Sequence, residues 1–319
     1  MKKIYLITED YDPATVGTLL ADYGELRYVP CKTERDIIEN CRDAEILISL
    51  YEPITPRVMD ALTQLKFICL TSIGYDAVDV DYATRKKIYV ANMPHYCLNE
   101  VAEHTIALIL ALHRRLFVYN EEVQKGVWRY DCAGQDIFRL STRTVGLLGF
   151  GKIAREVAKR IKPFGCRIVA YDPYVGKEVA DGYGVNLLDF ETLLEVSHII
   201  SLHLPLTKET RKLINKETIS LMSQKPILVN CARGDLIDEA ALVEALDSGQ
   251  ISGAGLDVFE TEPPDLERCN LLNRKNVILT PHAAFYSIDS IEESLIHIKN
   301  NVRYFLQGCL DKISLVNKF

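Results

Sequence analysis

The chain has 319 residues, 48% of them hydrophobic, which is enough for about two domains with sizeable cores. A formal net charge of −7 argues against a nucleic-acid footprint, and no apolar run reaches membrane-spanning length or resembles a signal sequence. Nine scattered cysteines without metal-ligand spacing fit a reducing cytoplasm, so we expect a cytoplasmic protein with no metal, nucleic-acid or membrane partner.

Residues 1–98 alternate short apolar runs with helical patterns. Strands are expected at Lys3–Thr8, Leu26–Pro30, Glu45–Leu50, Phe67–Thr71 and Ile88–Ala91. Helices are expected at Pro13–Tyr23, Glu34–Cys41 and Val80–Lys86, and another should begin at Thr55-Pro56, where proline takes the first helical position. This alternation predicts one α/β unit with a parallel sheet.

The next segment leads away from this unit. Asn99–Tyr119 is rich in apolar residues and predicts one long helix. Glu121–Arg143 is polar and irregular, and it holds Trp128, the single tryptophan. It is too long for a simple linker, so we interpret it as an arm for oligomer contacts.

The stretch from Thr144 to Asp172 reads TVGLLGFGKIAREVAKRIKPFGCRIVAYD. A buried strand is expected to run into the pattern G-x-G-x-x-A at Gly149, Gly151 and Ala154. One face of the following helix is expected to carry Ile153, Val157, Ile161 and Phe164, and Gly165 should end it. A second strand, Arg167–Tyr171, then runs to Asp172, 23 residues after Gly149.

This order predicts a dinucleotide-binding turn. Gly149 permits the sharp turn, and Gly151 lets a pyrophosphate approach the backbone. The free N–H groups at the helix start, at Lys152 and Ile153, attract the phosphate charge. Asp172 can accept hydrogen bonds from a ribose 2′-hydroxyl but repels a 2′-phosphate, so NAD is favoured over NADP. The alternative is a βαβ turn that binds no phosphate, because glycine-rich turns of this kind are common.

More α/β units follow Asp172. Strands are expected at His198–Leu202, Ile227–Asn230, Ile251–Asp257 and Val277–Thr280, and helices at Phe190–Glu195, Asn215–Met222 and Glu239–Ser248. The last helix, Ile288–Leu306, carries apolar residues at periodic spacing, namely Ile288, Ile291, Leu295, Ile298, Val302 and Phe305.

Three of these strands end in residues able to bind anions or move protons. Arg233 follows the first of them, Asp257 and Glu262 follow the second, and His282 follows the third. In open parallel sheets, ligands bind outside the carboxyl ends of the strands. Arg233 can hold the carboxylate of a 2-oxo acid and polarise its carbonyl, and protonated His282 can deliver a proton to the developing alkoxide. Glu262 would pair with the other ring nitrogen and favour the imidazolium. Taken singly, each residue would more often be a surface, salt-bridge or loop group.

The chain resembles the D-isomer-specific 2-hydroxyacid dehydrogenases over nearly its whole length. The motifs that carry the resemblance are TVGLLGFGKIAREVAKRIKPFG, Asp172, SLHLPLTKETRKLIN, VNCARGD, GLDVFETEP and TPHAA, in the family order. The resemblance places Arg233, Glu262 and His282 on the family's catalytic set. It implies two doubly wound parallel-sheet α/β domains, with a Rossmann NAD-binding domain at 99–288 inserted in a discontinuous flavodoxin-like substrate domain at 1–98 and 289–319.

The resemblance also implies contacts. Main-chain N–H groups around Ile73, Gly74 and Tyr75 would hold the substrate carboxylate. The cofactor would further touch Arg233 and His282, together with His203, Pro205, Thr207, Cys231, Asp257 and Ala284. Homodimers through the nucleotide domain are usual in the family. The implied activity is reversible hydride transfer between NAD(H) and a small 2-oxo or 2-hydroxy acid.

Two features leave alternatives open. The residues after His282 read Ala-Ala-Phe-Tyr-Ser and are similar to the C-terminal binding proteins, so an NAD(H)-sensing binding protein with secondary catalysis is the second reading. The loops Ser49–Ile54 and Thr71–Asp79 contain no Lys or Arg, which disfavours a phosphorylated substrate. Four tyrosines either line the substrate pocket or are packing residues, namely Tyr51, Tyr75, Tyr96 and Tyr286.

Overall fold

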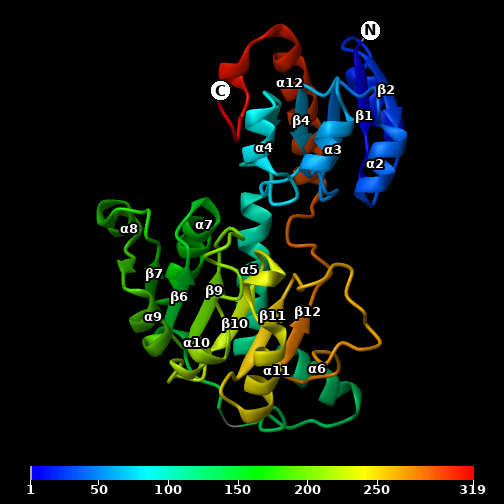
Figure 1. Ribbon diagram of the computed structural model, residues 1–319. Coiled ribbons are helices and arrows are strands. Elements are labelled where there is room, and N and C mark those ends of the chain that lie inside the picture. Colours follow the sequence, from blue (N-terminus) through cyan, green and yellow to red (C-terminus); the bar gives the residue numbers. More distant parts are fainter. Residues whose placement is uncertain (1, 135) are drawn as a thin grey trace. The chain divides into compact units, whose positions relative to one another are not determined.

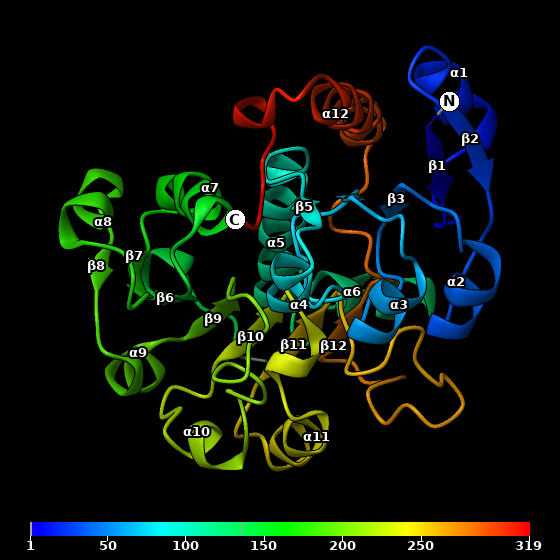
Figure 2. The same ribbon diagram turned by 45° about the horizontal axis from the view of Figure 1, so that its top comes forward.

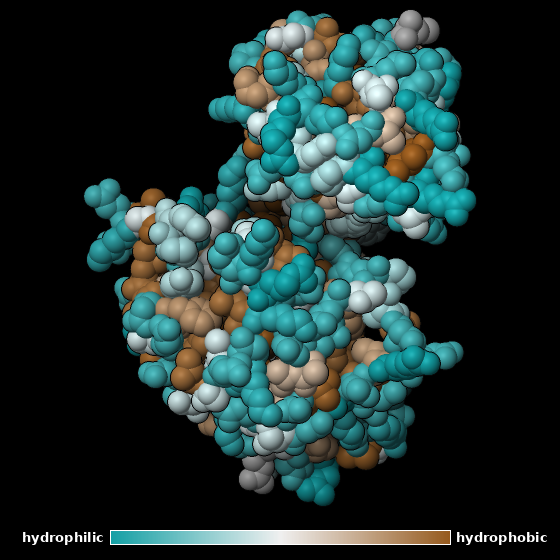
Figure 3. All heavy atoms as spheres, in the orientation of Figure 1, coloured by the Kyte–Doolittle hydropathy of each residue, from teal (hydrophilic) through white to brown (hydrophobic). Residues whose placement is uncertain are grey.

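The computed structural model describes residues 2–134 and 136–319 (Figure 1). Contacts divide the chain into two compact units, Met1–Tyr96 with Ser287–Phe319, and Cys97–Tyr286. We call them unit 1 and unit 2. None of the helices in the described part of the chain is both long enough and apolar enough to cross a membrane. The face drawn in Figure 3 is mainly hydrophilic, with hydrophobic residues lying among hydrophilic ones.

Unit 1 is built on a five-stranded parallel sheet with the order β2-β1-β3-β4-β5. The strands are β1 (Lys3–Leu6), β2 (Glu25–Tyr28), β3 (Ile46–Ser49), β4 (Phe67–Leu70) and β5 (Tyr89–Ala91). This is the flavodoxin-like order of a doubly wound sheet. Every residue of β3 and β4 is buried, as expected for strands covered on both faces.

Helices from both ends of the chain cover this sheet. They are α1 (Pro13–Leu20), α2 (Glu34–Asn40), α3 (Pro56–Ala61), α4 (Val80–Arg85) and α12 (Ile288–Gln307). Residues of α2, α3 and α4 share one core with Leu47 and Ile68 of the sheet. The late helix α12 packs against α1 and β4, and the rings of Phe67 and Phe305 stack with centroids 4.4 Å apart. Unit 1 therefore closes its core with residues from the far end of the chain.

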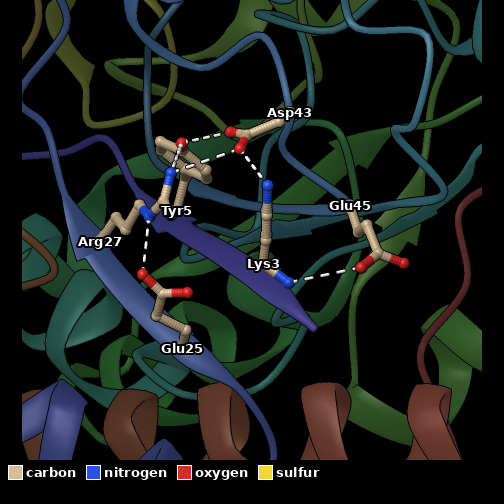
Figure 4. Close-up of polar contacts among 6 residues, drawn as sticks. All are labelled: Lys3, Tyr5, Glu25, Arg27, Asp43 and Glu45. Atoms are coloured by element: carbon tan, nitrogen blue, oxygen red, sulfur yellow. Dashed lines mark hydrogen bonds and ion pairs between the residues drawn. The ribbon is translucent and has the colours of Figure 1, made fainter. Parts of the chain in front are cut away.

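A charged network lies at the edge of this sheet (Figure 4). The Tyr5 hydroxyl donates to Asp43 at 2.5 Å, and Arg27 of the edge strand donates to the Tyr5 oxygen at 2.9 Å. The hydrogen bonds from Lys3 and Tyr5 lower the pKa of Asp43 to about 2. The network ties edge strand β2 to the sheet, and charged side chains on an edge discourage pairing with other chains.

Unit 2 has a seven-stranded parallel sheet with the order β12-β11-β10-β9-β6-β7-β8. The strands are β6 (Thr144–Leu148), β7 (Arg167–Tyr171), β8 (Asn186–Leu187), β9 (Ile199–Leu202), β10 (Ile227–Asn230), β11 (Gly253–Leu256) and β12 (Val277–Leu279). Strand order reverses between β6 and β9, as in the Rossmann fold. A ligand site is therefore expected at the carboxyl ends of these strands.

Helices cover both faces of this second sheet (Figure 2). They are α5 (Leu98–His113), α7 (Lys152–Ile161), α8 (Lys177–Tyr183), α9 (Phe190–Val196), α10 (Lys216–Ser220) and α11 (Glu239–Ser248). The helix α6 (Leu116–Gln124) contributes no residue to these cores. Leu147 and Ile199 share a core with α5 and α7, whereas Leu148 and Ile200 share one with α9, α10 and α11. Neighbouring strand residues thus point to opposite faces, which explains the nearly continuous apolar runs.

Several sequence expectations were wrong in detail. The helix expected at Asn99–Tyr119 is broken into α5 and α6 at Arg115, whose φ is 52°. The short elements α8 and β8 were not expected. Phe164 is 43% exposed, because α7 ends at Ile161 and a 3₁₀ turn carries the chain to Gly165.

The buried face of α12 agrees with the expected one at Ile298 and Val302 but differs at the start of the helix. Ile288 is 75% exposed, whereas Ser290, Ser294 and Asn301 are buried. A mixed polar and apolar face meets the rest of unit 1, so the apolar period alone gave the wrong orientation at the helix start.

Candidate active site

The glycine-rich turn follows β6 directly. Gly149 has φ 88°, and a Cβ atom there would lie 2.7 Å from the carbonyl oxygen of His203. Both the left-handed conformation and the close approach of the neighbouring loop require glycine. A Cβ on Gly151 would meet no protein atom within 4 Å, so packing inside the chain does not require this glycine. Its bare backbone at the start of α7 fits the close approach of a pyrophosphate.

Asp172 holds this turn from the end of β7. One carboxylate oxygen accepts from Phe150 N at 2.8 Å and the other accepts from Tyr174 N at 2.9 Å. Each oxygen keeps a lone pair, so the carboxylate can still accept from the hydroxyls of a ribose. Its position beside the turn fits a dinucleotide whose ribose carries no phosphate.

A second loop, after β9, lies against the glycine turn. His203 N donates to the carbonyl oxygen of Leu148 at 2.7 Å, and the imidazole Nε2 lies 2.9 Å from Ser201 Oγ. Burial lowers the pKa of His203 to about 4, so the ring is neutral near pH 7. The Thr210 hydroxyl donates to the Pro205 carbonyl at 2.6 Å and fixes the turn that presents Thr207.

Arg233 follows β10 in a loop shaped by its neighbours. The buried Asn230 donates to the Arg233 carbonyl at 2.8 Å and accepts from Ala232 N at 3.0 Å. A Cβ on Gly234 would lie 1.8 Å from the Phe259 carbonyl oxygen, so the loops after β10 and β11 touch through their backbones. Asn230 and Gly234 were not singled out in the sequence, although the run NCARGD contains both.

His282 and Glu262 lie together after β12 and β11. Nδ1 of His282 is 2.6 Å from one carboxylate oxygen of Glu262, and the other oxygen accepts from Phe259 N at 3.0 Å. Burial raises the pKa of Glu262, but the hydrogen bond and charge of His282, together with Phe259 N and Arg233, outweigh it and lower the pKa overall. Because Nδ1 faces Glu262, proton transfer to a substrate would use the other ring nitrogen, Nε2.

Asp257 organises the turn that carries His282. The residue is fully buried, and its carboxylate accepts from Ala283 N and Ala284 N at 2.9 Å each. Its carbonyl oxygen accepts from His282 N at 2.7 Å. His282 itself has φ 52°, an uncommon conformation for a residue other than glycine. Asp257 therefore shapes the backbone next to the proposed acid.

Cys231 precedes Arg233 in the same loop. Burial raises the pKa of its thiol to about 12, so the sulfur is neutral. A neutral, partly buried thiol is a poor nucleophile. Its place next to Arg233 and after β10 fits packing against a ligand better than covalent chemistry.

The expected carboxylate loop lies in unit 1. Asn92 donates to the Ile73 carbonyl at 2.7 Å and Ser72 to the Gly74 carbonyl at 2.7 Å. Both anchors use carbonyl oxygens of the loop and not the N–H groups of Ile73 and Gly74. Exposed fractions separate the four tyrosines, with 44% for Tyr51, 46% for Tyr75, 67% for Tyr286 and 6% for Tyr96. Of the four tyrosines, Tyr96 is therefore the one best interpreted as a packing residue.

A cavity of about 580 Å³ in unit 2 lies elsewhere. Its lining includes Ile199, Ile227 and Gly253, which are the first residues of β9, β10 and β11, together with His113 and Arg143. It therefore lies at the amino ends of the strands, on the side of the sheet away from Arg233 and His282.

Known proteins are similar to this chain in sequence. Residues 106–284 match the family model described as D-isomer specific 2-hydroxyacid dehydrogenase, NAD binding domain. A D-3-phosphoglycerate dehydrogenase of Methanocaldococcus jannaschii is 38% identical over 293 residues, which is 91% of this chain and 55% of that protein. A glyoxylate reductase of Korarchaeum cryptofilum is 38% identical over 284 residues, covering 86% of this chain and 84% of that protein.

A solved structure agrees with these matches. It is a D-lactate dehydrogenase from Aquifex aeolicus in complex with NAD and lactic acid, with a TM-score of 0.89, 32% identity and coverage of 99% of both chains. The chain thus spans about half the length of the phosphoglycerate dehydrogenase and most of the other two proteins. The chain therefore belongs to the D-isomer specific 2-hydroxyacid dehydrogenase family, a family of NAD-dependent oxidoreductases, and residues 106–284 lie in its NAD-binding domain.

Proposed function

We propose that the protein reduces small 2-oxo acids to D-2-hydroxy acids, and oxidises them in reverse, with unit 2 binding NAD and unit 1 contributing to the substrate site. The observation that carries this proposal is the 2.6 Å contact between His282 Nδ1 and Glu262. Both residues follow the carboxyl ends of strands of the same sheet, as do Arg233 and the dinucleotide turn. NAD, when bound, supplies the hydride donor or acceptor. The chain supplies anion binding, carbonyl polarisation and the proton.

Each proposed catalytic residue has a distinct task. The Arg233 guanidinium binds the substrate carboxylate in fork geometry and polarises the carbonyl. His282 holds a proton at Nε2 and delivers it to the carbonyl oxygen as that oxygen gains charge. The ionised Glu262 fixes the ring orientation and stabilises the imidazolium. In the reverse direction, neutral His282 accepts the hydroxyl proton at the same nitrogen.

The loops of unit 1 favour a substrate with an uncharged side chain. Loop residues 49–54 and 71–79 lie side by side, because Ile54 N donates to the Ala77 carbonyl at 2.8 Å. Neither loop has a lysine or arginine, and Glu52 and Asp76 add negative charge. Glu52 is used locally, because it accepts from the Ser49 hydroxyl at 2.7 Å. A phosphate on the substrate would meet repulsion here.

A substrate panel tests the activity. Glyoxylate, pyruvate, hydroxypyruvate and 3-phosphohydroxypyruvate should be supplied with NADH and with NADPH. We expect turnover with NADH on the three acids whose side chains carry no charge, and at least tenfold lower kcat/KM on the phosphorylated acid. Absence of turnover on a broad panel would contradict the proposal and favour the second reading, an NAD(H)-sensing binding protein. That reading rests on the Ala-Ala-Phe-Tyr-Ser run after His282.

The charge of Glu262 should matter most at alkaline pH. A carboxyl group with a lowered folded-state pKa stays ionised even somewhat below its ordinary value of 4.5, so Glu262 keeps its charge at neutral and alkaline pH and loses it only as the pH falls through the folded-state pKa. Glu262→Gln should lower kcat for reduction about 10–100-fold, and more at pH 8 than at pH 6, because the imidazolium loses its counter-charge. Glu267→Gln, on the exposed part of the same loop, is the control. Superimposable profiles for wild type and Glu262→Gln would remove this assignment.

Asp172 should decide between the two nicotinamide cofactors. Asp172→Asn removes the negative charge and keeps one acceptor oxygen for the turn. We expect the ratio of kcat/KM for NADPH to that for NADH to rise about 100-fold, since a 2′-phosphate is no longer repelled. Asp189→Asn, at the start of α9, removes a charge elsewhere in unit 2 and should leave the ratio unchanged. An unchanged ratio in Asp172→Asn would place the ribose elsewhere.

We also propose a homodimer that uses the segment made of residues 116–134 and 136–138. The helix α6 buries none of its side chains, although isolated helices of this length are marginal in water. Exposed apolar residues gather in this segment, namely Leu116 54%, Phe117 60%, Val123 45%, Trp128 87%, Tyr130 90% and Phe138 51%. A second copy of the chain would cover them, as patches of this kind mark interaction sites.

Sedimentation velocity tests the dimer. Wild type should sediment at about twice the chain mass of 36.1 kDa. Trp128→Ser with Tyr130→Ser should shift it to the monomer, whereas Tyr174→Ser, 95% exposed outside the segment, should not. A monomeric wild type at micromolar concentration would overturn the dimer.

All nine cysteines are free, which suits the reducing cytoplasm in which we place the protein.

A further inference from the structure

A histidine on α5 reaches the turn that carries His282. Nε2 of His104 lies 3.0 Å from Thr280 Oγ1 and 3.6 Å from a carboxylate oxygen of the fully buried Asp257. Thr280 lies just after β12, and its hydroxyl is 2.5 Å from the same Asp257 oxygen. His104, Thr280 and Asp257 thus form one connected group within unit 2.

The donors in this group follow from its chemistry. An ionised carboxylate only accepts, so the Thr280 hydroxyl donates its single hydrogen to Asp257. The Thr280 oxygen can then only accept from His104, which requires a hydrogen on Nε2 of that ring. The hydrogen bonds are therefore donated from His104 to Thr280 and from Thr280 to Asp257. This order fixes the tautomer of His104 and the orientation of the Thr280 hydroxyl hydrogen.

The end of this chain of hydrogen bonds is the backbone beside the proposed acid. Asp257 accepts the amide N–H groups of Ala283 and Ala284 with its carboxylate and that of His282 with its carbonyl oxygen. His282 has φ 52°, a conformation that persists only where the surroundings hold it. A carboxylate free to rotate would release two of the three amides.

We propose that His104 is a positioning residue for His282: its Nε2–H locks the Thr280 hydroxyl and the Asp257 carboxylate, which in turn hold the turn 282–284. His104 touches no reacting atom and acts through Asp257. The inference rests on the proposed function for its kinetic consequence, but its structural consequence, protection of the amides of 282–284, does not depend on turnover.

Two pairs of variants separate donor loss from general damage. His104→Leu removes the donor and His104→Gln keeps an N–H at a similar reach; Thr280→Val removes the hydroxyl and Thr280→Ser keeps it. We expect His104→Leu and Thr280→Val each to lower kcat about tenfold with less than a threefold change in KM. His104→Gln and Thr280→Ser should recover to within about threefold of wild type. Glu103→Gln, on the preceding residue and exposed, is the control on the same helix.

A double variant tests whether His104 acts through Thr280. If His104 acts through Thr280, the double variant His104→Leu with Thr280→Val should be no slower than Thr280→Val alone, because the two losses are not additive. Two independent tenfold losses would multiply to about a hundredfold and would overturn the relay.

Amide hydrogen exchange of the cofactor-free protein gives a readout apart from activity. The segment 282–286 should exchange at least about tenfold faster in His104→Leu than in wild type or His104→Gln, with the melting temperature within about 2 °C. Unchanged exchange in His104→Leu, or equal loss in His104→Leu and His104→Gln, would overturn the inference. If the exchange results hold but wild type turns over no 2-oxo acid, the proposed function fails and the positioning network stands.

Discussion

Replacement of His282 by asparagine should lower kcat for 2-oxo acid reduction by about 10²–10⁴-fold, the usual contribution of a general acid. Nδ1 of His282 faces Glu262, and we assign the proton transfer to the other ring nitrogen, Nε2, so loss of the ring removes the proton donor. Asparagine is the sharpest replacement because it tolerates the left-handed conformation that His282 adopts at φ 52°. The melting temperature should therefore stay the same or rise while activity is lost.

The measurement is kcat and KM with NADH, alongside NADH affinity by fluorescence titration. NADH affinity should change by less than about threefold, since the dinucleotide turn is built from other residues. Phe285→Leu changes a ring whose centroid is 6.4 Å from that of His282 and serves as the neighbouring control. A kcat within tenfold of wild type for His282→Asn would mean that another group delivers the proton.

Arg233→Gln should lower kcat/KM by about 10²–10⁴-fold, because two charge-assisted hydrogen bonds to the substrate are lost at about 1.5–3 kcal/mol each. Arg233→Lys should recover only part of this loss, since an ammonium keeps the charge but not the planar fork. The rigid surroundings of Arg233, with Asn230 on its carbonyl and Gly234 against the Phe259 backbone, make repositioning of a lysine difficult.

A comparison of an acid with its methyl ester tests the proposed contact between Arg233 and the substrate carboxylate. Wild type should prefer pyruvate over methyl pyruvate by at least about a hundredfold, and Arg233→Gln should lose most of that preference. A variant at Arg211, a largely exposed arginine paired with Asp235, should keep the preference and controls for net charge. If Arg233→Gln lowers the rates on acid and ester equally, Arg233 does not bind the carboxylate.

The parts of the site that could be predicted from sequence are local. The turn at Gly149 and Gly151 and the acid at Asp172 belong to one βαβ unit, so spacing along the chain fixes their positions in space. The parallel sheets of both units follow from alternating strands and helices, whereas their flavodoxin-like and Rossmann organisation was expected only from the family resemblance. The proposed partners His282 and Glu262 were expected to meet from their chemistry and from family resemblance, and their contact measures 2.6 Å.

The parts that could not be predicted depend on tertiary packing. Asp257 was expected at a strand end, but its contacts with Thr280 and with His104 of α5 were not, because no period or motif links His104 to the other two in sequence. The break at Arg115 needs a positive φ at a residue that carries no sequence signal for it. The exposure of Ile288 at the start of α12 was missed because Ser290 and Ser294 are buried there, and periodicity records only apolar residues.

The return of the chain to unit 1 has a consequence for synthesis on the ribosome. The five strands of the first sheet emerge early, yet Phe305 of α12 stacks on β4 and Leu315 pairs with Ala91 of β5 only when the final residues are made. Unit 2 is continuous from Cys97 to Tyr286 and can fold while those residues are still awaited. The part translated first should thus be the last to become resistant to proteases, and nascent chains halted before α12 should be the ones that engage chaperones.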